Sequence, residues 1–312
     1  MILVTGATGY VGRNLVSRLV RRGDRVRCLV RQGSPKLGLL RDLSVELSYG
    51  DVTDESSLAQ AMDGVDAVVH TVAIIREKGG QTYARINHQG TRNVVLAAQR
   101  AGVKRLVHVS AIGASNSPAY AYLYSKWLGE EEVKASEIPW VILRPSFLFE
   151  EGEEFFTTLA CVVKALPVVP IIGNGKSLFQ PIALSDVLRC IEAGLDSDIY
   201  NGRVIELGGP ERISYEGIMD LVMETIGHRR PKVHIPTSLM RPLVALMDTL
   251  LPYPPVTRRQ LAMLPLDNVP SGEPVEPTFG FLPRPLRGNL NYLRKITYRE
   301  ALATVLGFRA WH

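Results

Sequence analysis

The sequence predicts an α/β protein, with a doubly wound parallel sheet in its N-terminal part and a smaller, mixed C-terminal part. Three observations favour this fold class. Short apolar stretches alternate with amphipathic ones over the first 145 residues, a glycine-rich turn follows the first apolar stretch, and prolines become frequent after Ser146. A chain of 312 residues has room for one large domain or two modest ones.

Strands and helices are expected to alternate through the N-terminal part. We expect strands at residues 1–5, 25–30, 45–49, 67–70, 105–110 and 140–143, and helices at 10–22, 55–62, 83–101 and 120–136. Asp54 is the expected N-cap of the second helix. Right-handed crossovers then bring the carboxyl ends of all strands to one edge of the sheet, where such folds bind their ligands.

The C-terminal part follows a looser pattern. We place the domain boundary between 1–145 and 146–312, with residues 179–210 returning to the first domain through a strand at 203–207. Helices are expected at 154–165, 185–195, 214–227 and 238–250. The last of these is amphipathic, and we expect it to be packed against the protein rather than against lipid. This part should shape a substrate pocket.

Composition excludes several classes of protein. Hydrophobic residues make up 46% and charged residues 21% of the chain, with a formal net charge of +5, as in soluble globular proteins. The three cysteines are far apart and the histidines lack ligand spacing, so we expect a reducing compartment and no metal site. The sequence contains no basic stripe with interleaved aromatic residues, so it does not indicate nucleic-acid binding.

The apolar segments also bear on location. The chain begins with a strand-like stretch rather than a secretory signal, and no apolar run reaches the length of about 18 residues that a membrane-spanning helix needs. We therefore expect a cytoplasmic protein without a transmembrane segment. Peripheral attachment to a membrane and membership of a multi-subunit assembly remain open as alternatives.

The strongest motif is a glycine-rich turn between the first strand and the first helix. Glycines at 6, 9 and 12 give the spacing GxxGxxG. Gly6 permits a tight turn, Gly9 lets the backbone approach a pyrophosphate, and Gly12 lets the helix pack closely on the sheet. Because the helix N-terminus favours anions, the motif in this position predicts binding of a dinucleotide cofactor in a Rossmann-type domain.

The end of the second strand distinguishes NADP from NAD. An acidic residue there usually binds the ribose 2′-hydroxyl of NAD, but this chain has Arg31, 19 positions after Gly12. A guanidinium can pair with a 2′-phosphate, and Ser34 and Lys36 could assist it. The sequence therefore predicts that NADP(H) is preferred over NAD(H). The alternative is that Arg31 is a solvated surface residue.

A tyrosine and a lysine form the candidate catalytic pair. Tyr122 and Lys126 are four residues apart and would share one face of a helix. We expect the ammonium to lower the pKa of the tyrosine, which could then exchange a proton with a substrate hydroxyl or carbonyl. Ser110, at the end of the preceding strand, could hydrogen-bond the same substrate oxygen. The alternative is that Tyr122 and Lys126 merely bind the nicotinamide ribose.

Together these residues resemble the short-chain dehydrogenase/reductase superfamily, in its atypical, extended branch. The resemblance rests on Gly6-Ala7-Thr8-Gly9-Tyr10-Val11-Gly12, Ser110, Tyr122 and Lys126, with further matches at 87–94, 143–146, 179–182, 185–187 and 206–211. Within that branch the chain is similar to relatives of the NADPH-binding accessory subunit of respiratory complex I, including its tail at 279–286. The resemblance covers nearly the whole chain.

The resemblance and the motifs together imply a set of site residues. The expected catalytic residues are Ser110, Tyr122 and Lys126. The expected cofactor-binding residues are Thr5, Gly6, Thr8, Gly9, Tyr10, Val11, Gly12, Arg31, Ser34, Lys36, Asp51, Val52, Thr71, Val72, Ala73, Asn87, Val109, Tyr122, Lys126, Pro145, Ser146 and Phe147.

Two functions follow from this reasoning. The favoured one is an NADP(H)-dependent oxidoreductase or epimerase that acts on an unidentified small molecule. The alternative is a non-catalytic NADPH-binding subunit of a larger, complex I-like assembly.

Overall fold

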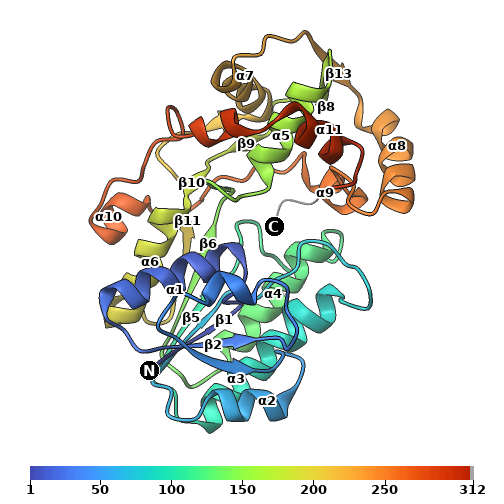
Figure 1. Ribbon diagram of the computed structural model, residues 1–312. Coiled ribbons are helices and arrows are strands. Elements are labelled where there is room, and N and C mark those ends of the chain that lie inside the picture. Colours follow the sequence, from blue (N-terminus) through green and yellow to red (C-terminus); the bar gives the residue numbers. More distant parts are fainter. Residues whose placement is uncertain (310–312) are drawn as a thin grey trace. The chain divides into compact units, whose positions relative to one another are not determined.

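The computed structural model describes residues 1–309 and divides the chain into two compact units (Figure 1). Unit 1 comprises Met1–Pro145 and Val187–Glu206. Unit 2 comprises Ser146–Asp186 and the described residues from Leu207 onward.

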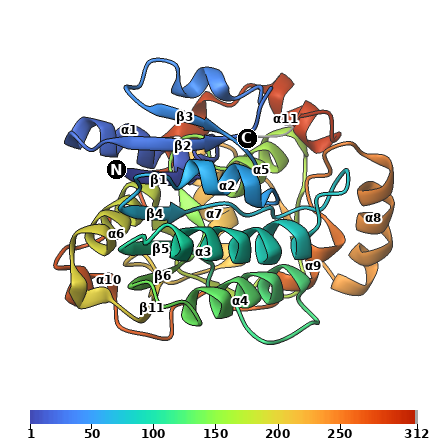
Figure 2. The same ribbon diagram turned by 90° about the horizontal axis from the view of Figure 1, so that it is seen from below.

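A seven-stranded sheet forms the centre of unit 1, in the order β11-β6-β5-β4-β1-β2-β3 (Figure 2). Its strands are β1 (Ile2–Thr5), β2 (Val26–Val30), β3 (Glu46–Tyr49), β4 (Ala67–His70), β5 (Arg105–Val109), β6 (Trp140–Pro145) and β11 (Arg203–Leu207). Neighbours from β3 to β6 pair in parallel. Because Gly202 N donates to Trp140 O and Ser146 N to Leu207 O, β11 also runs parallel to β6. The strand expected at 203–207 thus lies in the sheet, but of the segment 179–210 that we expect to return, unit 1 includes only residues 187–206.

Helices cover both faces of this sheet. One face packs against α2 (Glu55–Ala61), α3 (Gly90–Arg100) and α4 (Ala121–Lys134) through a fully apolar core. On the other face lie α1 (Tyr10–Arg22) and α6 (Leu184–Asp196), which Arg18 and Glu192 join by an ion pair of 2.6 Å. Apolar residues on both faces explain why the parallel strands appear in the sequence as short, wholly apolar runs. The predicted fold class is confirmed.

The predicted helix at 83–101 begins differently from our expectation. Ala84–Gln89 forms a π-helix (η2), and α3 follows directly. Asn87 lies inside the π-helix with its side chain fully buried. Such π-helical turns often occur at functional sites, and here the turn directs a polar side chain into the interior. The expected cap of α2 is confirmed, since the Asp54 carboxylate accepts a hydrogen bond from Ser56 N.

Unit 2 combines helices with three pairs of short strands. The pairs are β7 (Leu148–Phe149) with β10 (Ile182–Ala183), β9 (Leu178–Phe179) with β12 (Ile213–Ser214), and β8 (Val169–Ile172) with β13 (Lys232–Ile235). The helices are α5 (Phe155–Ala165), α7 (Tyr215–Ile226), α8 (Thr237–Leu250), α9 (Arg258–Met263), α10 (Val275–Phe279) and α11 (Tyr298–Val305). Short 3-10 helices are η1 (Leu37–Leu40) and η3 (Asp198–Tyr200) in unit 1, and η4 (Asn291–Lys295) in unit 2. Residues of α5 and α7 form most of the core of unit 2.

Helix α8 is packed on one side only. Met240 and Val244 are buried against Leu261 of α9, in agreement with the predicted packing. A second side carries four exposed leucines, at 239, 243, 246 and 250. Among residues 1–309, no helix combines the length and the hydropathy of a membrane span.

Replacing Gly12 by alanine tests the packing of α1. A Cβ atom at Gly12 would lie 2.1 Å from the carbonyl oxygen of Gly6, so the helix would have to move. We expect Gly12→Ala to lower the free energy of unfolding by about 1–3 kcal/mol in urea denaturation. Gly38→Ala is the control, because its Cβ meets no atom within 4 Å. Equal stability of the two variants would contradict this packing.

Candidate functional site

The glycine-rich turn has the geometry of an anion cradle. Gly6 has a φ of 77°, and a Cβ there would lie 2.6 Å from Thr71 Oγ1. Gly9 caps α1 without a side-chain hydrogen bond, and the first turn holds no acidic residue. The terminal N–H groups of the helix therefore remain available for an anion. The other predicted residues of the turn, Thr8, Tyr10 and Val11, are partly buried.

The end of β4 lies against this turn. Thr71 Oγ1 donates to the carbonyl oxygen of Thr5 at 2.8 Å. The Val72 nitrogen lies 3.1 Å from the position that a Cβ of Gly6 would occupy. Thr5, Gly6, Thr71 and Val72 are thus brought together as predicted from the topology, and Ala73 follows them as an exposed residue.

Two residues that follow β3 are held by local hydrogen bonds. Asp51 Oδ1 accepts from Thr53 N at 2.9 Å and from Thr53 Oγ1 at 2.8 Å. The Val52 carbonyl accepts from Asn93 Nδ2 at 3.0 Å, and the Val52 side chain is buried. These contacts fix the loop beside the second and third strands in one conformation.

Three cations gather beyond the end of β2. Burial lowers the pKa of Lys36, and the charges of Arg13 and Arg31 lower it further. None of these three side chains forms an ion pair with a carboxylate in the described part of the chain. Ser34 Oγ accepts from Lys36 N at 3.4 Å. Cations that repel one another without a counterion suit a polyanionic ligand. We had not identified Arg13 from the sequence, although it follows Gly12 directly.

Lys126 is a deeply buried cation of the candidate site. Its side chain is 1% exposed, and Nζ donates to the Val109 carbonyl oxygen at 2.9 Å. Burial lowers the pKa of Lys126 to about 8, while the nearby Glu130 carboxylate acts in the opposite direction. The ammonium form therefore still predominates at neutral pH.

Tyr122 behaves differently from our sequence-based expectation. Burial, and then the neighbouring Tyr83 phenol, raise the pKa of Tyr122 to about 12. The two rings meet edge to face, with centroids 5.8 Å apart. The expected lowering by Lys126 is not found: Lys126 is not among the groups that shift the pKa of Tyr122, and removal from water is the largest cause of the shift. Tyr122 therefore carries its proton at neutral pH.

Ser110 is engaged by a buried ion pair. Its hydroxyl donates to Glu130 Oε1 at 2.5 Å. Glu130 is fully buried and accepts two hydrogen bonds from Arg144, from Nε at 2.8 Å and from Nη2 at 2.6 Å. Arg144 Nη1 also lies 3.4 Å from Glu206. The sequence reasoning missed Glu130, although it stands one helical turn after Lys126.

Asn87 connects the loop after β4 to the helix that carries Tyr122. Its Nδ2 donates to Ile74 O and to Ser125 Oγ, both at 3.0 Å, and its Oδ1 accepts from Ile74 N at 2.8 Å. Ser125 Oγ donates in turn to Tyr122 O at 2.7 Å. Asn87 thus positions the loop after β4, through Ile74, and helix α4, through Ser125.

Two buried histidines lie near Lys126. His70 and His108 stack with ring centroids 5.2 Å apart. His70 Nδ1 lies 2.6 Å from Thr5 Oγ1 and its Nε2 lies 3.0 Å from Thr91 Oγ1, whereas neither ring nitrogen of His108 has a hydrogen-bond partner among the described residues. Burial and the charge of Lys126 lower the pKa of both, to about 3 for His70. Both imidazoles are therefore neutral at physiological pH.

The last three predicted residues span the point where the chain passes from unit 1 to unit 2. Pro145 ends β6, and its carbonyl accepts from Ile112 N at 3.2 Å. In unit 2, Ser146 Oγ donates to Asn268 Oδ1 at 2.6 Å, and the Phe147 ring packs 4.2 Å from that of Phe155. A role of Ser146 and Phe147 in cofactor binding stays a prediction.

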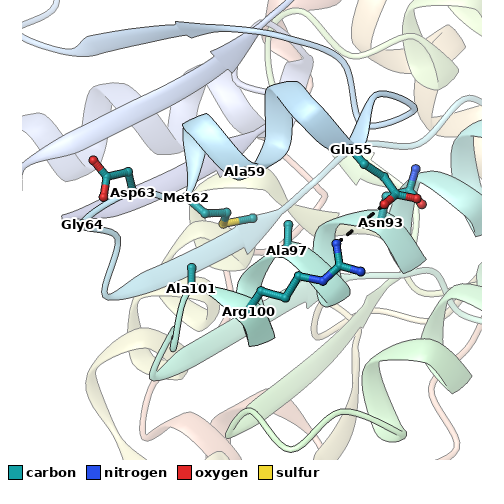
Figure 3. Close-up of a pocket in the computed structure, with 9 residues that line it drawn as sticks. All are labelled: Glu55, Ala59, Met62, Asp63, Gly64, Asn93, Ala97, Arg100 and Ala101. Atoms are coloured by element: carbon teal, nitrogen blue, oxygen red, sulfur yellow. Dashed lines mark ion pairs between the residues drawn. The ribbon is translucent and has the colours of Figure 1, made fainter.

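A separate surface cavity of about 290 Å³ lies between α2 and α3 (Figure 3). Arg100 and Glu55 face each other across it, with Nη1 3.7 Å from the carboxylate. None of the residues expected to bind the cofactor lines this cavity. It is therefore distinct from the candidate site at the carboxyl ends of the strands.

A family model described as NAD(P)H-binding matches residues 6–164, which include the glycine-rich turn and the whole of α4. The chain belongs to this family. This match and the sequence relatives described below bear out the resemblance to the extended short-chain dehydrogenase/reductases.

Several proteins of known name are similar over much of their length. Sterol demethylase protein B of Methylococcus capsulatus is 31% identical over 269 residues, 80% of this chain and 81% of that protein. A mitochondrial NADH dehydrogenase [ubiquinone] 1 alpha subcomplex subunit 9 of Arabidopsis thaliana is 29% identical, over 80% of this chain and 65% of that protein. Ceramide reductase of Caulobacter vibrioides is 32% identical over 56% of this chain and 54% of its own length.

A solved structure supports the same fold. The crystal structure of gox2253 superposes with a TM-score of 0.73 and 27% identity, covering 97% of each chain. The relatives thus bear the names of a reductase and of a subunit of NADH dehydrogenase, and the matching family model describes NAD(P)H binding.

Proposed function

We propose that this chain is an NADP(H)-dependent oxidoreductase of the extended short-chain dehydrogenase/reductase type. The observation that carries the proposal is the face of α4, where Tyr122 and the buried Lys126 stand one turn apart beside the carboxyl end of β5. When bound, the nicotinamide supplies or accepts the hydride. The chain itself supplies the proton and the charge that the carbonyl or hydroxyl group needs.

The cation cluster supports a preference for NADP(H) over NAD(H). Arg13, Arg31 and Lys36 concentrate positive charge where the second strand ends, which in this fold is the side of the adenosine ribose. Arginine forms paired hydrogen bonds with phosphate oxygens. It can therefore bind the 2′-phosphate of NADP in a way that is not open to the 2′-hydroxyl of NAD.

The protonation states favour reduction of a carbonyl. A phenol with a pKa near 12 holds its proton at neutral pH and can donate it to the oxygen that becomes negative as hydride arrives. The Lys126 ammonium stabilises the phenolate that remains. An epimerase on the same fold would need the reverse proton transfer as well, and the raised pKa of Tyr122 opposes that step.

The sequence relatives suggest a substrate class. Two relatives at least 30% identical bear the names of enzymes that act on sterols and ceramides. We therefore propose that the substrate is an apolar, lipid-type ketone. This choice is open to test with a panel that also includes sugar nucleotides and quinones.

A non-catalytic NADPH-binding subunit is the second candidate. The similarity to a complex I subunit over 80% of this chain favours it. So does the exposed row of four leucines on α8, since an apolar row of this kind on a surface is typical of proteins that bind partners.

Replacing Arg31 tests the cofactor preference. We expect Arg31→Met to raise the Kd for NADPH about 10-fold, because one phosphate contact is lost, and to leave the Kd for NADH unchanged. Fluorescence titration measures both. Arg21→Met is the control, because it removes an equal charge from the exposed last turn of α1. Equal losses for both nucleotides, or tighter binding of NADH by the wild type, would show that NADP(H) is not preferred.

Replacing Tyr122 tests the chemistry. We expect Tyr122→Phe to reduce kcat on a ketone substrate by about 10²- to 10⁴-fold while NADPH still binds, because only the proton donor is removed. Tyr124→Phe is the control, since its ring stacks on Trp127 in the same helix. Turnover by Tyr122→Phe at the rate of the wild type would exclude Tyr122 as the proton donor. Tight NADPH binding without any turnover by the wild type across the panel would favour the accessory subunit.

A further inference from the structure

Glu130 occupies a position that the chemistry described so far does not use. It stands on α4 one turn after Lys126 and two turns after Tyr122, and its side chain is fully buried. Residues at this spacing share one face of a helix. A carboxylate on the same buried face as the candidate acid and its lysine therefore needs a physical explanation.

The surroundings of Glu130 hold its carboxylate charged and fixed. Arg144 on β6 donates to both carboxylate oxygens, and Ser110 at the end of β5 donates to Oε1 at 2.5 Å. A buried charge is tolerated only when it is paired and hydrogen-bonded in this way. Lys134 adds a longer contact of 3.8 Å. Glu130 thus joins α4 to two strands of the sheet.

The other groups around Lys126 carry little charge. His70 on β4 and His108 on β5 are neutral imidazoles at physiological pH, and the Tyr122 phenol on α4 is also neutral. Val109 O accepts one proton of the ammonium. Among the described residues, Glu130 is the negatively charged group that acts on Lys126, and its carboxylate favours the ammonium form.

We propose that Glu130, held in place by Ser110 and Arg144, is the positioning residue that keeps Lys126 protonated at neutral pH. Ser110 then acts through Glu130 rather than on a substrate oxygen. The inference rests on the proposed function only for its effect on catalysis, since the charge of Lys126 can be measured without cofactor or substrate.

The direction of the effect follows from the electrostatics. Burial already lowers the pKa of Lys126 to about 8, close enough to neutrality that a further fall would leave much of the lysine uncharged. Removing the Glu130 charge removes the interaction that opposes burial. A neutral Lys126 would no longer stabilise a phenolate on Tyr122, so the proton donor would become a weaker acid.

The charge of Lys126 is measurable by NMR of the full chain with ¹³C-labelled lysine. The ε-carbon signal missing from Lys126→Met identifies the residue, and its shift against pH gives the titration midpoint. We expect a midpoint near 8 in the wild type. In Glu130→Gln we expect the midpoint to fall by at least one pH unit, a 10-fold loss of proton affinity. Glu131→Gln is the matched control, because Glu131 is exposed and bonds to Lys134. An unchanged midpoint in Glu130→Gln would overturn the proposal.

Two further variants protect the test against unfolding. Glu130→Gln leaves Arg144 with Glu206 as its remaining partner. If that variant does not fold, Glu130→Gln combined with Arg144→Met removes both members of the buried pair. The midpoint must still fall, by a smaller amount, because the loss of the Arg144 cation acts in the opposite direction. Thermal unfolding followed by circular dichroism verifies the fold of each variant before the titration.

Ser110→Ala separates positioning from direct catalysis. We expect a smaller fall in the Lys126 midpoint, because the hydrogen bond that orients Glu130 is lost. An unchanged midpoint together with a large loss of kcat would show that Ser110 acts on the substrate, and would overturn its assigned role. If the Lys126 midpoint falls in Glu130→Gln but the wild type turns over no substrate, the inference is supported and the proposed oxidoreductase is refuted. Failure of the inference and failure of the proposed function are therefore distinguishable.

Discussion

The burial of the Lys126 ammonium is the constraint on which the candidate site depends. A charge removed from water needs local partners, and the fold supplies the Val109 carbonyl and, one turn along α4, the Glu130 carboxylate. That carboxylate is itself buried and needs Arg144 and Ser110. One buried cation thus accounts for a network that fastens α4 to the sheet at the carboxyl ends of its strands.

The same burial sets the protonation states of Tyr122 and Lys126. Removal from water favours neutral forms, so it raises the pKa of Tyr122 and lowers that of Lys126. A neutral phenol beside an ammonium is suited to protonate an oxygen that receives hydride. The end of β2 follows a different principle: among the described residues, Arg13, Arg31 and Lys36 have no carboxylate partner, and their uncompensated charge favours a phosphate.

The sequence was sufficient to predict the sheet of unit 1 and the anion cradle, because buried parallel strands and glycine-rich turns leave local patterns. It could not show the π-helix at Ala84–Gln89, which depends on where the side chain of Asn87 finds its partners. Strand pairs of two residues, as in β7 and β10, are too short for any periodicity to appear. The spacing of Tyr122 and Lys126 indicated that they share a helix face, but spacing carries no information on burial. The predicted lowering of the Tyr122 pKa was therefore wrong. Glu130 has the appearance of a solvated helix residue until β5 and β6 are known to cover it.

The central claim is that the nicotinamide half of NADPH reaches Lys126 while the 2′-phosphate lies at the cation cluster. The most direct test compares two ligands by the Lys126 ε-carbon signal: NADPH, and 2′,5′-ADP, which has the phosphate but lacks the nicotinamide. The account predicts that both ligands bind in competition, that NADPH shifts the Lys126 signal, and that 2′,5′-ADP leaves it in place. Saturation with NADPH without any change in the Lys126 signal would contradict the account.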